Sequence, residues 1–418
     1  MNNNNRNNGN SVRPVTAFTL VQQLSLPFDF SLKGVFLTSP SQLLLDIFKA
    51  WKNARRHKRR KRYQLSFEFD VEKELVRLRD AIFSRRWHPG PSSCFIIHDP
   101  KMREVFAAQF RDRVVHHLLY DYLAPLFEPG FIRDSYSCIK GRGTHDGINR
   151  LEEKIKKVSR NWSRPCFILK LDIKGYFMHI DRARLLEISL RTLETFREHI
   201  DYPLVAYLLR VIVLDNPVGH CRRVGNMSEW DALPPSKSLF CSPPGCGLPI
   251  GNLTSQLFSN IYLNEFDQFM EGLVGEGRYG RYVDDAYVVG ESAAVLRRVI
   301  PFASIYLEQS LRLSLAQNKT AIYSAYRGVP FLGGFLKPFR RYVSSGSLAR
   351  MERKLRGVVA MSPKEQFNSV NSYLGITSHF RAYNIRRQWI SGPFAFARTS
   401  GYFTKSLLTW KPFRKKLG

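Results

Sequence analysis

The chain has 418 residues, of which 44% are hydrophobic, enough for two or three domains with a sizeable core. Its 64 Lys and Arg residues against 35 Asp and Glu residues give a formal net charge of +29. This excess favours a polyanionic partner, with nucleic acid as the first candidate and an anionic membrane surface as the second. The sequence has no apolar run of about 18 residues and no signal-peptide core at its N-terminus, so we expect a soluble, cytoplasmic protein without a membrane span.

Residues 1–13 are rich in Asn and offer almost nothing to bury, so they predict a disordered tail. An amphipathic helix pattern follows from residue 41 and runs into a nearly unbroken row of cations. Such a row repels itself unless a polyanion lies against it, which favours contact with a phosphate backbone over a solvated charged face. The candidate nucleic-acid-binding residues of this row are Arg55, Arg56, Lys58, Arg59, Arg60, Lys61 and Arg62.

Apolar residues recur at helical spacing in VVHHLLYDYLAPLF, from Val114 onward, and predict a core-facing helix. His116 and His117 lie off the apolar stripe, so we expect surface or capping residues. A Gly-rich turn, SYSCIKGRGTHDG, follows, and CFILKLDIKGYF after it predicts a buried strand that ends in a polar turn. Residues 215–247 are rich in Pro and Gly and predict irregular structure.

The second half of the chain continues with a helix pattern, SQLFSNIYLNEFDQFM, which carries large apolar residues on one face. RYGRYVDDAYVVGE then predicts a hairpin, and residues 292–311 predict another helix. Beyond about residue 340 acidic residues are rare, which indicates a separate basic, helical domain.

The six cysteines are scattered without a Cys-x-x-Cys pair, which is typical of reduced thiols rather than of a disulfide framework. The irregular segment holds four residues that can bind zinc, but their spacing lacks the close ligand pairs of structural zinc sites. Ordinary loop residues are therefore the favoured interpretation of His220, Cys221, Cys241 and Cys246.

Three carboxylates fall where predicted strands end. Asp284 and Asp285 lie between two apolar runs, and Asp172 follows the strand FILKL. An isolated Asp-Asp pair usually marks a polar turn, but strands that pair would bring all three carboxylates together, and like charges at that distance require cations. Two divalent metal ions roughly 4 Å apart would neutralise them, activate a 3'-hydroxyl and stabilise a pyrophosphate leaving group. Mg²⁺ suits few carboxylates completed by phosphates and water, and Mn²⁺ is a possible substitute.

The sequence blocks around these carboxylates resemble a known family. YVDD between apolar strands, with Asp172 upstream in LDIKGYF, resembles the palm of a reverse transcriptase, and matches continue in order over most of residues 95–340. The stretch from REVFAAQF to RGTHDG resembles the fingers blocks of the bacterial group, which includes the group II intron enzymes. GLPIGNLTSQLFSNIYLNEFD resembles the template-facing loop with its helix, and LSLAQNKT and FLGGFL resemble the last two palm blocks. Five or six blocks in one order make the resemblance specific.

The resemblance implies an α+β fold of the right-hand polymerase type, with fingers, an antiparallel palm sheet with helices, and a helical thumb. The expected partners are a template RNA, a cDNA primer–template hybrid and dNTPs. SVNSYLGITSHFRAYNIRR suits a thumb helix that grips duplex phosphate, although a packed surface helix is the alternative. The expected divisions are an N-terminal extension with fingers at 14–165, a palm at 166–341 and a basic thumb at 342–418.

The resemblance also implies roles around the metal site. Asp172 and Asp284 would be the principal metal ligands, with Asp285 in a supporting role. The backbone from Ile173 to Tyr176 would lie against the metal-bound triphosphate. Lys319 matches a lysine that protonates the leaving pyrophosphate, although a solvated lysine is the alternative reading of that position.

Further residues match positions that contact the nucleotide. Phe177 matches the aromatic residue beneath the sugar, where its ring would exclude a 2'-hydroxyl; simple palm packing is the alternative. Lys140 and Arg142 fall where the family places cations on the triphosphate, and Arg103 is a third candidate.

The template-facing loop departs from most reverse transcriptases. Ile250 stands where they have Gln before the Gly, here Gly251, and the loop continues to Gln256, a candidate nucleic-acid contact. Loss of a hydrogen-bonding side chain beside the nascent base pair predicts reduced fidelity. The I-G-N-x-x-S-Q form resembles the enzymes of diversity-generating retroelements, which copy a template RNA with errors opposite adenine and act with a small basic accessory protein. Some antiviral-defence reverse transcriptases, which can act with a second defence protein, share related loops.

Two other classes remain open at the level of sequence. A two-metal nuclease would use a similar carboxylate cluster, but it would not need Phe177 or the Gly251 loop followed by a helix. A catalytically inactive RNA-binding protein would keep the positive charge and lose metal ligands, whereas all three carboxylates are present here.

Overall fold

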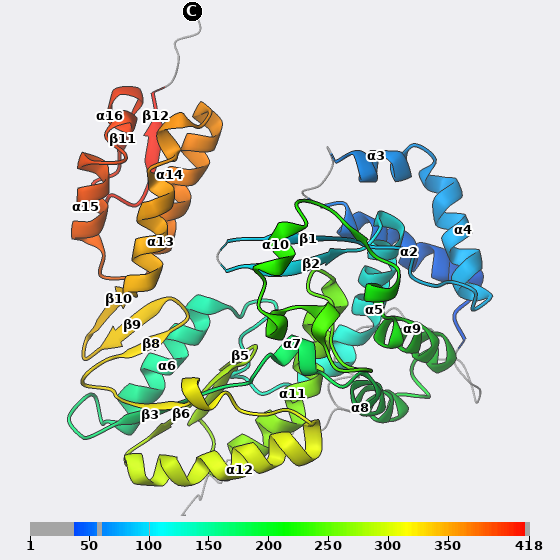
Figure 1. Cartoon of the computed structure of the whole chain (residues 1–418), viewed down its shortest axis with the longest axis horizontal. Helices are drawn as coiled ribbons and strands as arrows, with labels where there is room; N and C mark the ends of the chain where they lie inside the picture. Colours follow the sequence, from blue (N-terminus) through cyan, green and yellow to red (C-terminus); the bar gives the residue numbers. More distant parts are fainter. Residues whose placement is uncertain (1–36, 57–60, 100, 414–418) are drawn as a thin grey trace, which may run out of the picture.

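The structure is a computed structural model that describes residues 37–56, 61–99 and 101–413. Its centre is an antiparallel sheet in the order β5-β6-β3-β7, and the N-terminal and C-terminal groups of helices lie on different sides of this centre (Figure 1). The predicted tail of residues 1–13 lies outside the described residues. The strands of the sheet are β3 (Phe167–Asp172), β5 (Tyr279–Tyr282), β6 (Asp285–Gly290) and β7 (Ala321–Ser324).

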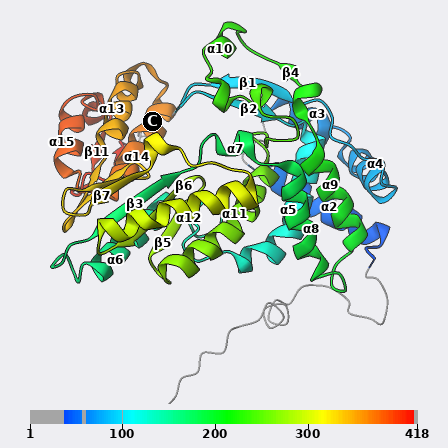
Figure 2. The same cartoon turned by 60° about the horizontal axis from the view of Figure 1, so that its bottom comes forward.

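The two faces of the central sheet differ because side chains alternate along each strand. Leu169, Leu171 and Val288 join the largest core cluster, to which α11 (Leu253–Val274) and α12 (Ala293–Leu311) contribute from one face. Figure 2 shows these two helices running along the sheet. On the other face Ile168, Tyr287 and Val289 pack with residues of α6 (Thr144–Val158). The predicted strand, hairpin and two helices of this region are all present.

The N-terminal part is a group of helices with a small sheet. The helix α5 packs against α2 and α11, and Ser39 caps α2 by accepting a hydrogen bond from the Gln42 N–H. The strands β1 and β2 form a hairpin, to which β4 of the irregular segment adds in parallel. The elements are α2 (Pro40–Ala54), α3 (Arg62–Glu68), α4 (Val71–Phe83), β1 (Ser93–Ile97), β2 (Arg103–Ala107), α5 (Phe110–Phe127), α8 (Arg182–Glu194), α9 (Tyr202–Leu214) and β4 (Arg222–Arg223).

Residues 215–247 are irregular, as predicted, with short 3₁₀ turns and one short helix, α10 (Ser228–Asp231). The segment is held on the β1–β2 hairpin by Glu104, which is buried and accepts hydrogen bonds from Ser238 Oγ at 2.7 Å and from the Leu239 N–H at 2.8 Å. The segment is therefore fixed against this hairpin. All six cysteines are free thiols, and His220 pairs with Asp215.

The C-terminal part begins at a second small sheet of three strands and continues as helices with a core of their own around Trp389 and Phe394. The predicted boundary at residue 342 falls inside β10, and the predicted helical thumb also contains a two-stranded sheet, β11–β12. The elements are β8 (Val329–Phe331), β9 (Gly334–Lys337), β10 (Arg340–Val343), α13 (Ser345–Leu355), α14 (Pro363–Ser378), α15 (Tyr383–Ser391), α16 (Phe396–Ser400), β11 (Gly401–Phe403) and β12 (Trp410–Pro412).

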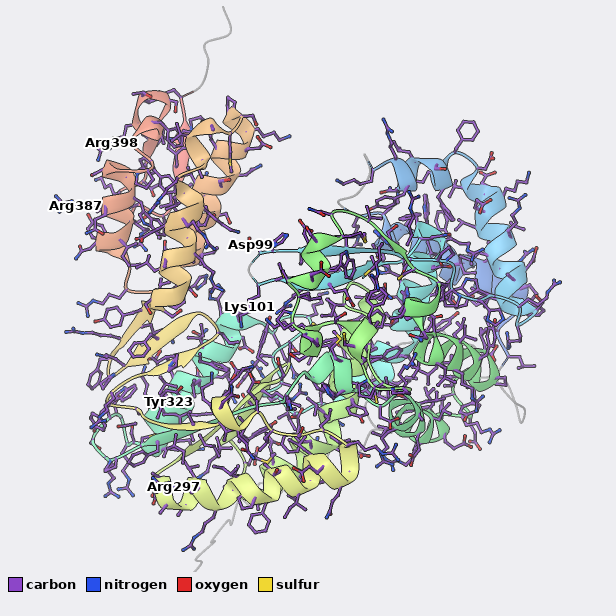
Figure 3. The ribbon with its side chains drawn as sticks, viewed as in Figure 1. Asp99, Lys101, Arg297, Tyr323, Arg387 and Arg398 are labelled. Carbon is purple, nitrogen blue, oxygen red and sulfur yellow. The ribbon has the colours of Figure 1, made fainter. Side chains whose placement is uncertain are left out.

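The β1–β2 hairpin and the C-terminal helices touch across the molecule. Asp99, at the tip of the β1–β2 hairpin, forms an ion pair with Lys354 of α13, and Figure 3 shows Asp99 at the end of the hairpin that approaches this helix. Within the residues that the structure describes, none of the helices is both long and apolar enough to cross a membrane.

Candidate active site

The structure brings the three predicted carboxylates to one edge of the central sheet. Asp172, the last residue of β3, lies directly opposite Asp285, the first residue of β6. Residues opposite each other in antiparallel strands have Cα atoms about 4.5–5.5 Å apart and side chains on the same face. Asp284 occupies the turn between β5 and β6, and its carbonyl accepts a hydrogen bond from the Ile173 N–H at 3.3 Å. The cluster therefore joins two segments more than a hundred residues apart in sequence.

Lysines provide the nearest positive charge to this cluster. Lys170 Nζ lies 3.1 Å from Asp285 Oδ1, and Lys319 Nζ lies 2.8 Å from Asp172 Oδ1. Burial raises the pKa of Asp284, and the neighbouring charge of Asp172 raises it further. Burial also raises the pKa of Asp285, while Lys170 acts in the opposite direction. Ionisation of all three carboxylates is therefore unfavourable without added positive charge, and a bound cation would supply that charge.

The predicted nucleotide contacts Phe177, Ile250 and Gly251 are held together by packing and by backbone hydrogen bonds. Phe177 lies in the short helix α7 (Tyr176–His179) and packs in an apolar cluster that includes Ile250 and Phe106. The Leu248 N–H donates to the Phe177 carbonyl, and the Phe106 N–H donates to the Ile250 carbonyl, both at 2.8 Å. The loop that contains Ile250 and Gly251 is therefore fixed both to α7 and to the β1–β2 hairpin.

Gly251 is required by this attachment. Its φ is +128°, and a Cβ atom there would lie 2.4 Å from the Phe106 carbonyl oxygen, so only glycine fits. Gln256, one turn into α11, is exposed. Of the predicted nucleotide and template contacts, Phe177, Ile250 and Gly251 thus lie together, with Gln256 following on the adjoining helix.

Comparison with known proteins identifies this arrangement. Residues 98–335 match the family model described as reverse transcriptase (RNA-dependent DNA polymerase). The chain belongs to this family. The α+β right-hand fold, RNA-directed DNA polymerisation and binding of a template RNA follow from membership.

Individual relatives of this reverse transcriptase are distant. Protein YkfC of Escherichia coli (strain K12) is 25% identical over 294 residues, which cover 62% of this chain and 70% of that protein. Telomerase from Candida albicans in complex with a TWJ fragment of telomeric RNA is similar with a TM-score of 0.45 and 11% identity over 75% of this chain. Apo telomerase from Candida tropicalis has a TM-score of 0.45 and 12% identity. The chain spans 57% and 58% of those two telomerase chains.

Reverse transcriptases use divalent metal ions, and the carboxylate cluster fits such ions in its chemistry. Its donors are carboxylate oxygens, which suit hard cations, and the raised pKa of Asp284 records negative charge that a cation would offset. In the described part of the chain, no three acidic, His or Cys side chains already converge as a metal site, and Asp172 and Asp285 each form an ion pair with a lysine. Asp172, Asp284 and Asp285 are the residues that would hold the ions.

The three basic residues of this reverse transcriptase that were predicted to bind the triphosphate differ in their exposure. Lys140 is exposed, as a phosphate contact requires. Arg142 instead uses Nη1 to donate to the carbonyls of Ile132 at 2.7 Å and Ser135 at 3.1 Å. The expected contact between Arg142 and the triphosphate is therefore not supported by its position, since this guanidinium braces the loop between α5 and α6. Arg103, at the start of β2, is exposed.

The residues of the predicted basic row also differ in their surroundings. Arg55 is half-buried, forms an ion pair with Glu68 at 2.8 Å and lies over the ring of Trp51 at 4.6 Å, so it stabilises the fold rather than presenting its charge to a phosphate. Arg56, Lys61 and Arg62 are exposed and suit the predicted phosphate contact. The remaining candidates, Lys58, Arg59 and Arg60, lie outside the described residues.

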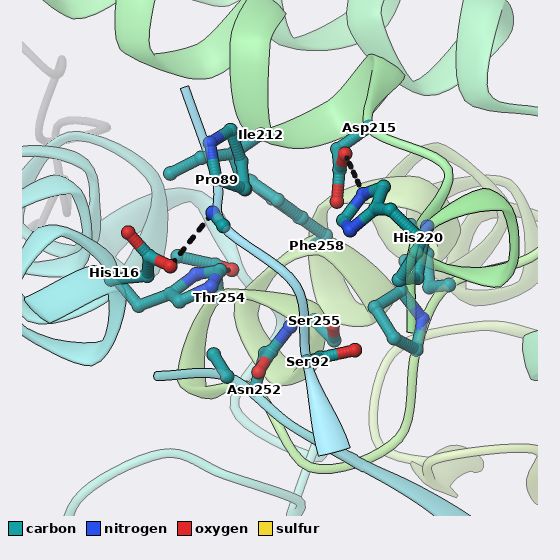
Figure 4. A pocket seen from close by; sticks show the side chains of 16 residues that line it. Pro89, Ser92, His116, Ile212, Asp215, His220, Asn252, Thr254, Ser255 and Phe258 are labelled. Carbon is teal, nitrogen blue, oxygen red and sulfur yellow. Dashed lines mark hydrogen bonds and ion pairs between the residues drawn. The ribbon is translucent and has the colours of Figure 1, made fainter. Parts of the chain in front are cut away.

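The expectation of a surface position for His116 is wrong. The residue is buried, and its Nδ1 lies 2.8 Å from Thr254 Oγ1 on α11. Figure 4 shows the two side chains in the wall of a pocket between α5 and the start of α11, with Asp215 and His220 paired on its far side. The apolar stripe did not predict the burial of His116, because α5 packs on α2 on one side and on α11 on another. The helix therefore buries more than one face.

Proposed function

We propose that this reverse transcriptase copies one specific RNA into cDNA with frequent errors, in the cytoplasm, as the polymerase of a diversity-generating retroelement. The observation that carries the proposal is Ile250 in the template-facing loop, within the I-G-N-x-x-S-Q sequence. Template RNA, a primer–template hybrid, dNTPs and a small basic accessory protein are the proposed partners. Two Mg²⁺ ions, replaceable by Mn²⁺, are the proposed cofactors.

The surroundings of Ile250 support low fidelity. The side chain packs in the apolar cluster that contains Phe177 and Phe106, so the pocket offers an alkyl group where a hydrogen-bonding amide would stand. Sites that hydrogen-bond a substrate discriminate far more strongly than sites that offer only apolar contact. A mispaired nucleotide is therefore rejected mainly by shape, and errors rise.

The residues around the carboxylates have separable roles in nucleotide transfer. Divalent ions held there would supply the positive charge that activates a primer 3'-hydroxyl and stabilises the leaving pyrophosphate. Phe177 excludes nucleotides with a 2'-hydroxyl. Lys319 delivers a proton to the pyrophosphate. The hydrogen bond that Lys319 donates to Asp172 raises the pKa of Lys319, which keeps its amine protonated at neutral pH.

The excess of positive charge supports a hybrid substrate. An RNA/DNA hybrid is recognised mainly through its backbone and 2'-hydroxyls, and the +29 net charge provides the cations for it. In the C-terminal part, Arg381 between α14 and α15 and Arg387 on α15 are exposed, and Figure 3 shows Arg387 and Arg398 on the outer side of that part. We propose that the exposed cations of this part grip the duplex.

Sequencing of DNA made in cells that carry the native locus tests the proposal, with an Asp284→Ala locus as the control. The proposal expects cDNA of a nearby repeat with substitutions at template adenines in the wild type alone. Repetitive or concatenated cDNA, particularly after phage infection, would instead assign the enzyme to antiviral defence. Equal DNA in both strains would exclude cDNA synthesis by this chain.

A further inference from the structure

The turn that carries the catalytic carboxylates contains a strained residue. Val283, between Tyr282 and Asp284, has a φ of +56°. This left-handed conformation is an outlier for a β-branched residue, and such strain persists only where the surroundings hold it in place. The positions of Asp284 and Asp285 therefore depend on whatever holds Val283.

One side of Val283 is held through its N–H group. This N–H donates to Ser137 Oγ at 3.3 Å. Ser137 is in turn fixed by Asn260 of α11, whose Nδ2 donates to the Ser137 carbonyl at 2.8 Å and whose Oδ1 lies 3.3 Å from Ser137 Oγ. Both Ser137 and Asn260 are 1% exposed, so water does not compete for these bonds.

The other side of Val283 is held through its carbonyl. Arg281 Nη1 donates to the Val283 carbonyl at 2.8 Å. The same guanidinium makes a two-pronged ion pair with Asp267 of α11, with Nε to Oδ1 at 2.7 Å and Nη2 to Oδ2 at 2.6 Å. Arg281 and Asp267 are each 1% exposed. Parallel hydrogen bonds of this kind fix the plane of the guanidinium, and with it the direction of Nη1.

Both anchors lie on one helix. Asn260 and Asp267 are seven residues apart, which is two turns and places them on the same face of α11. We propose that α11 clamps Val283 from both sides through Ser137 and Arg281, and that these four polar residues are positioning residues that set the carboxylates for nucleotide transfer. The inference rests on the polymerase activity of the family and not on which RNA is copied.

The clamp explains why charges are buried next to the active site. A buried ion pair seldom adds net stability, because desolvation offsets the attraction, and is better explained by the specific geometry it imposes. Arg281 cannot be replaced by Lys without loss, since a single ammonium cannot bind two carboxylate oxygens and a carbonyl in one plane. If either hold on Val283 is lost, the turn can relax toward negative φ and displace Asp284.

Ser137→Ala tests the clamp with a small, buried change. Ser159→Ala is its matched control, because Ser159 Oγ also accepts a backbone N–H, from Trp162 at 2.8 Å, and Trp162 also has a positive φ of +68°. The control turn lies between α6 and β3, away from the carboxylates. A merely structural hydroxyl should behave alike at the two positions.

Two readouts separate positioning from stability. The first is hydrogen–deuterium exchange of the peptide 279–288 in the protein without nucleic acid, and the second is kcat and KM for dNTP on an RNA template with a DNA primer. We expect Ser137→Ala to speed exchange and to lower kcat, each about tenfold, with primer–template Kd unchanged within about twofold. Ser137→Thr, which keeps the hydroxyl, restores both. Ser159→Ala leaves exchange of this peptide and kcat unchanged.

Other outcomes overturn the clamp. Unchanged exchange in Ser137→Ala, or equal losses of kcat in Ser137→Ala and Ser159→Ala, would show that the hydroxyl does not position the turn. Arg281→Lys gives a second measurement on the carbonyl side and is expected to lose more kcat than Ser137→Ala. If the wild type lacks polymerase activity on every primed template, the exchange readout still decides whether the clamp exists, so the two failures remain distinct.

Discussion

Lys319 Nζ lies 2.8 Å from Asp172 Oδ1, so an amine stands beside a predicted metal ligand at the edge where pyrophosphate would leave. The hydrogen bond to Asp172 raises the pKa of Lys319. The stability that this bond contributes is fully present below the ordinary lysine pKa and is lost only as the pH rises through the higher folded value. The amine is therefore charged throughout the physiological range.

Removal of this amine should slow the chemical step. Lys319→Met is expected to lower the single-turnover rate about 100-fold, because a positioned general acid contributes about 10²- to 10⁴-fold, with a smaller change in KM for dNTP. Lys337→Met is the control, since Lys337 is exposed at the end of β9 and its loss removes the same charge. A rate within about threefold of the control would exclude proton delivery by Lys319.

Removal of the charge on Asp284 should stabilise the protein while abolishing activity. The folded-state pKa of this carboxyl is raised, first by burial and then by Asp172. Its ionisation therefore costs stability as the pH rises above about 4. We expect Asp284→Asn to raise Tm at pH 7, in buffer with a chelator, and to raise it less at pH 4.

The control for this prediction is an exposed carboxylate. Glu308→Gln on α12 removes a charge at an exposed position, and surface substitutions usually change stability by less than about 0.5 kcal/mol. Equal Tm values for the wild type and Asp284→Asn at pH 7 would show that ionisation of Asp284 does not destabilise the folded state.

The parts of the site that were predicted are those that depend on patterns within short stretches of sequence. The alternation along FILKLD and the apolar runs around YVDD place Asp172 and Asp285 at strand ends, and the family resemblance pairs those strands. The register of β3 with β6 agrees with this prediction. Phe177 and Ile250 were found in the same way, since each has a fixed offset from a recognisable block.

The parts that were missed depend on contacts that neither periodicity nor motif spacing reports. Arg142 looks like a phosphate ligand in its Gly-rich turn, but the fold brings the Ile132 carbonyl to its guanidinium. Arg55 looks like part of a basic row, yet Glu68 on the next helix neutralises it. The hydrogen bond from Val283 to Ser137 spans 146 residues, and no periodicity or motif spacing reports such a contact.

Phe177 should determine the choice of sugar. Phe177→Val is expected to lower the ratio of kcat/KM for dNTP to kcat/KM for rNTP by at least about tenfold, because a smaller side chain no longer collides with a 2'-hydroxyl. Phe240→Val is the control: Phe240 packs in the same apolar cluster but on the irregular segment. Equal ratios for the two variants would assign Phe177 to packing alone.

Burial of His116 should make the protein sensitive to acid. Burial lowers the pKa of this imidazole to about 3, whereas an unfolded His titrates at about 6.5. The folded state stays neutral while the unfolded state takes up a proton, so stability is present above pH 6.5 and falls by about 1.4 kcal/mol per pH unit below it. We expect the fall in Tm from pH 7 to pH 5 to be smaller in His116→Asn than in the wild type.

An exposed histidine provides the comparison for His116. His88 lies on the surface, so His88→Asn should reproduce the acid sensitivity of the wild type. If His116→Asn and His88→Asn lose Tm equally between pH 7 and pH 5, the histidine on α5 does not account for the acid sensitivity.

Restoring a polar side chain in the template-facing loop should raise fidelity. The pocket around Ile250 is apolar on the side of Phe177 and Phe106, and an amide there could hydrogen-bond the nascent base pair. We expect Ile250→Gln to lower the substitution rate at template adenines about tenfold or more on a defined RNA, since hydrogen-bonded discrimination exceeds apolar discrimination. Ile250→Val, which stays apolar, should keep the wild-type rate. Equal error rates in Gln and Val variants, or faithful copying of adenines by the wild type, would remove the structural basis for proposing an error-prone enzyme.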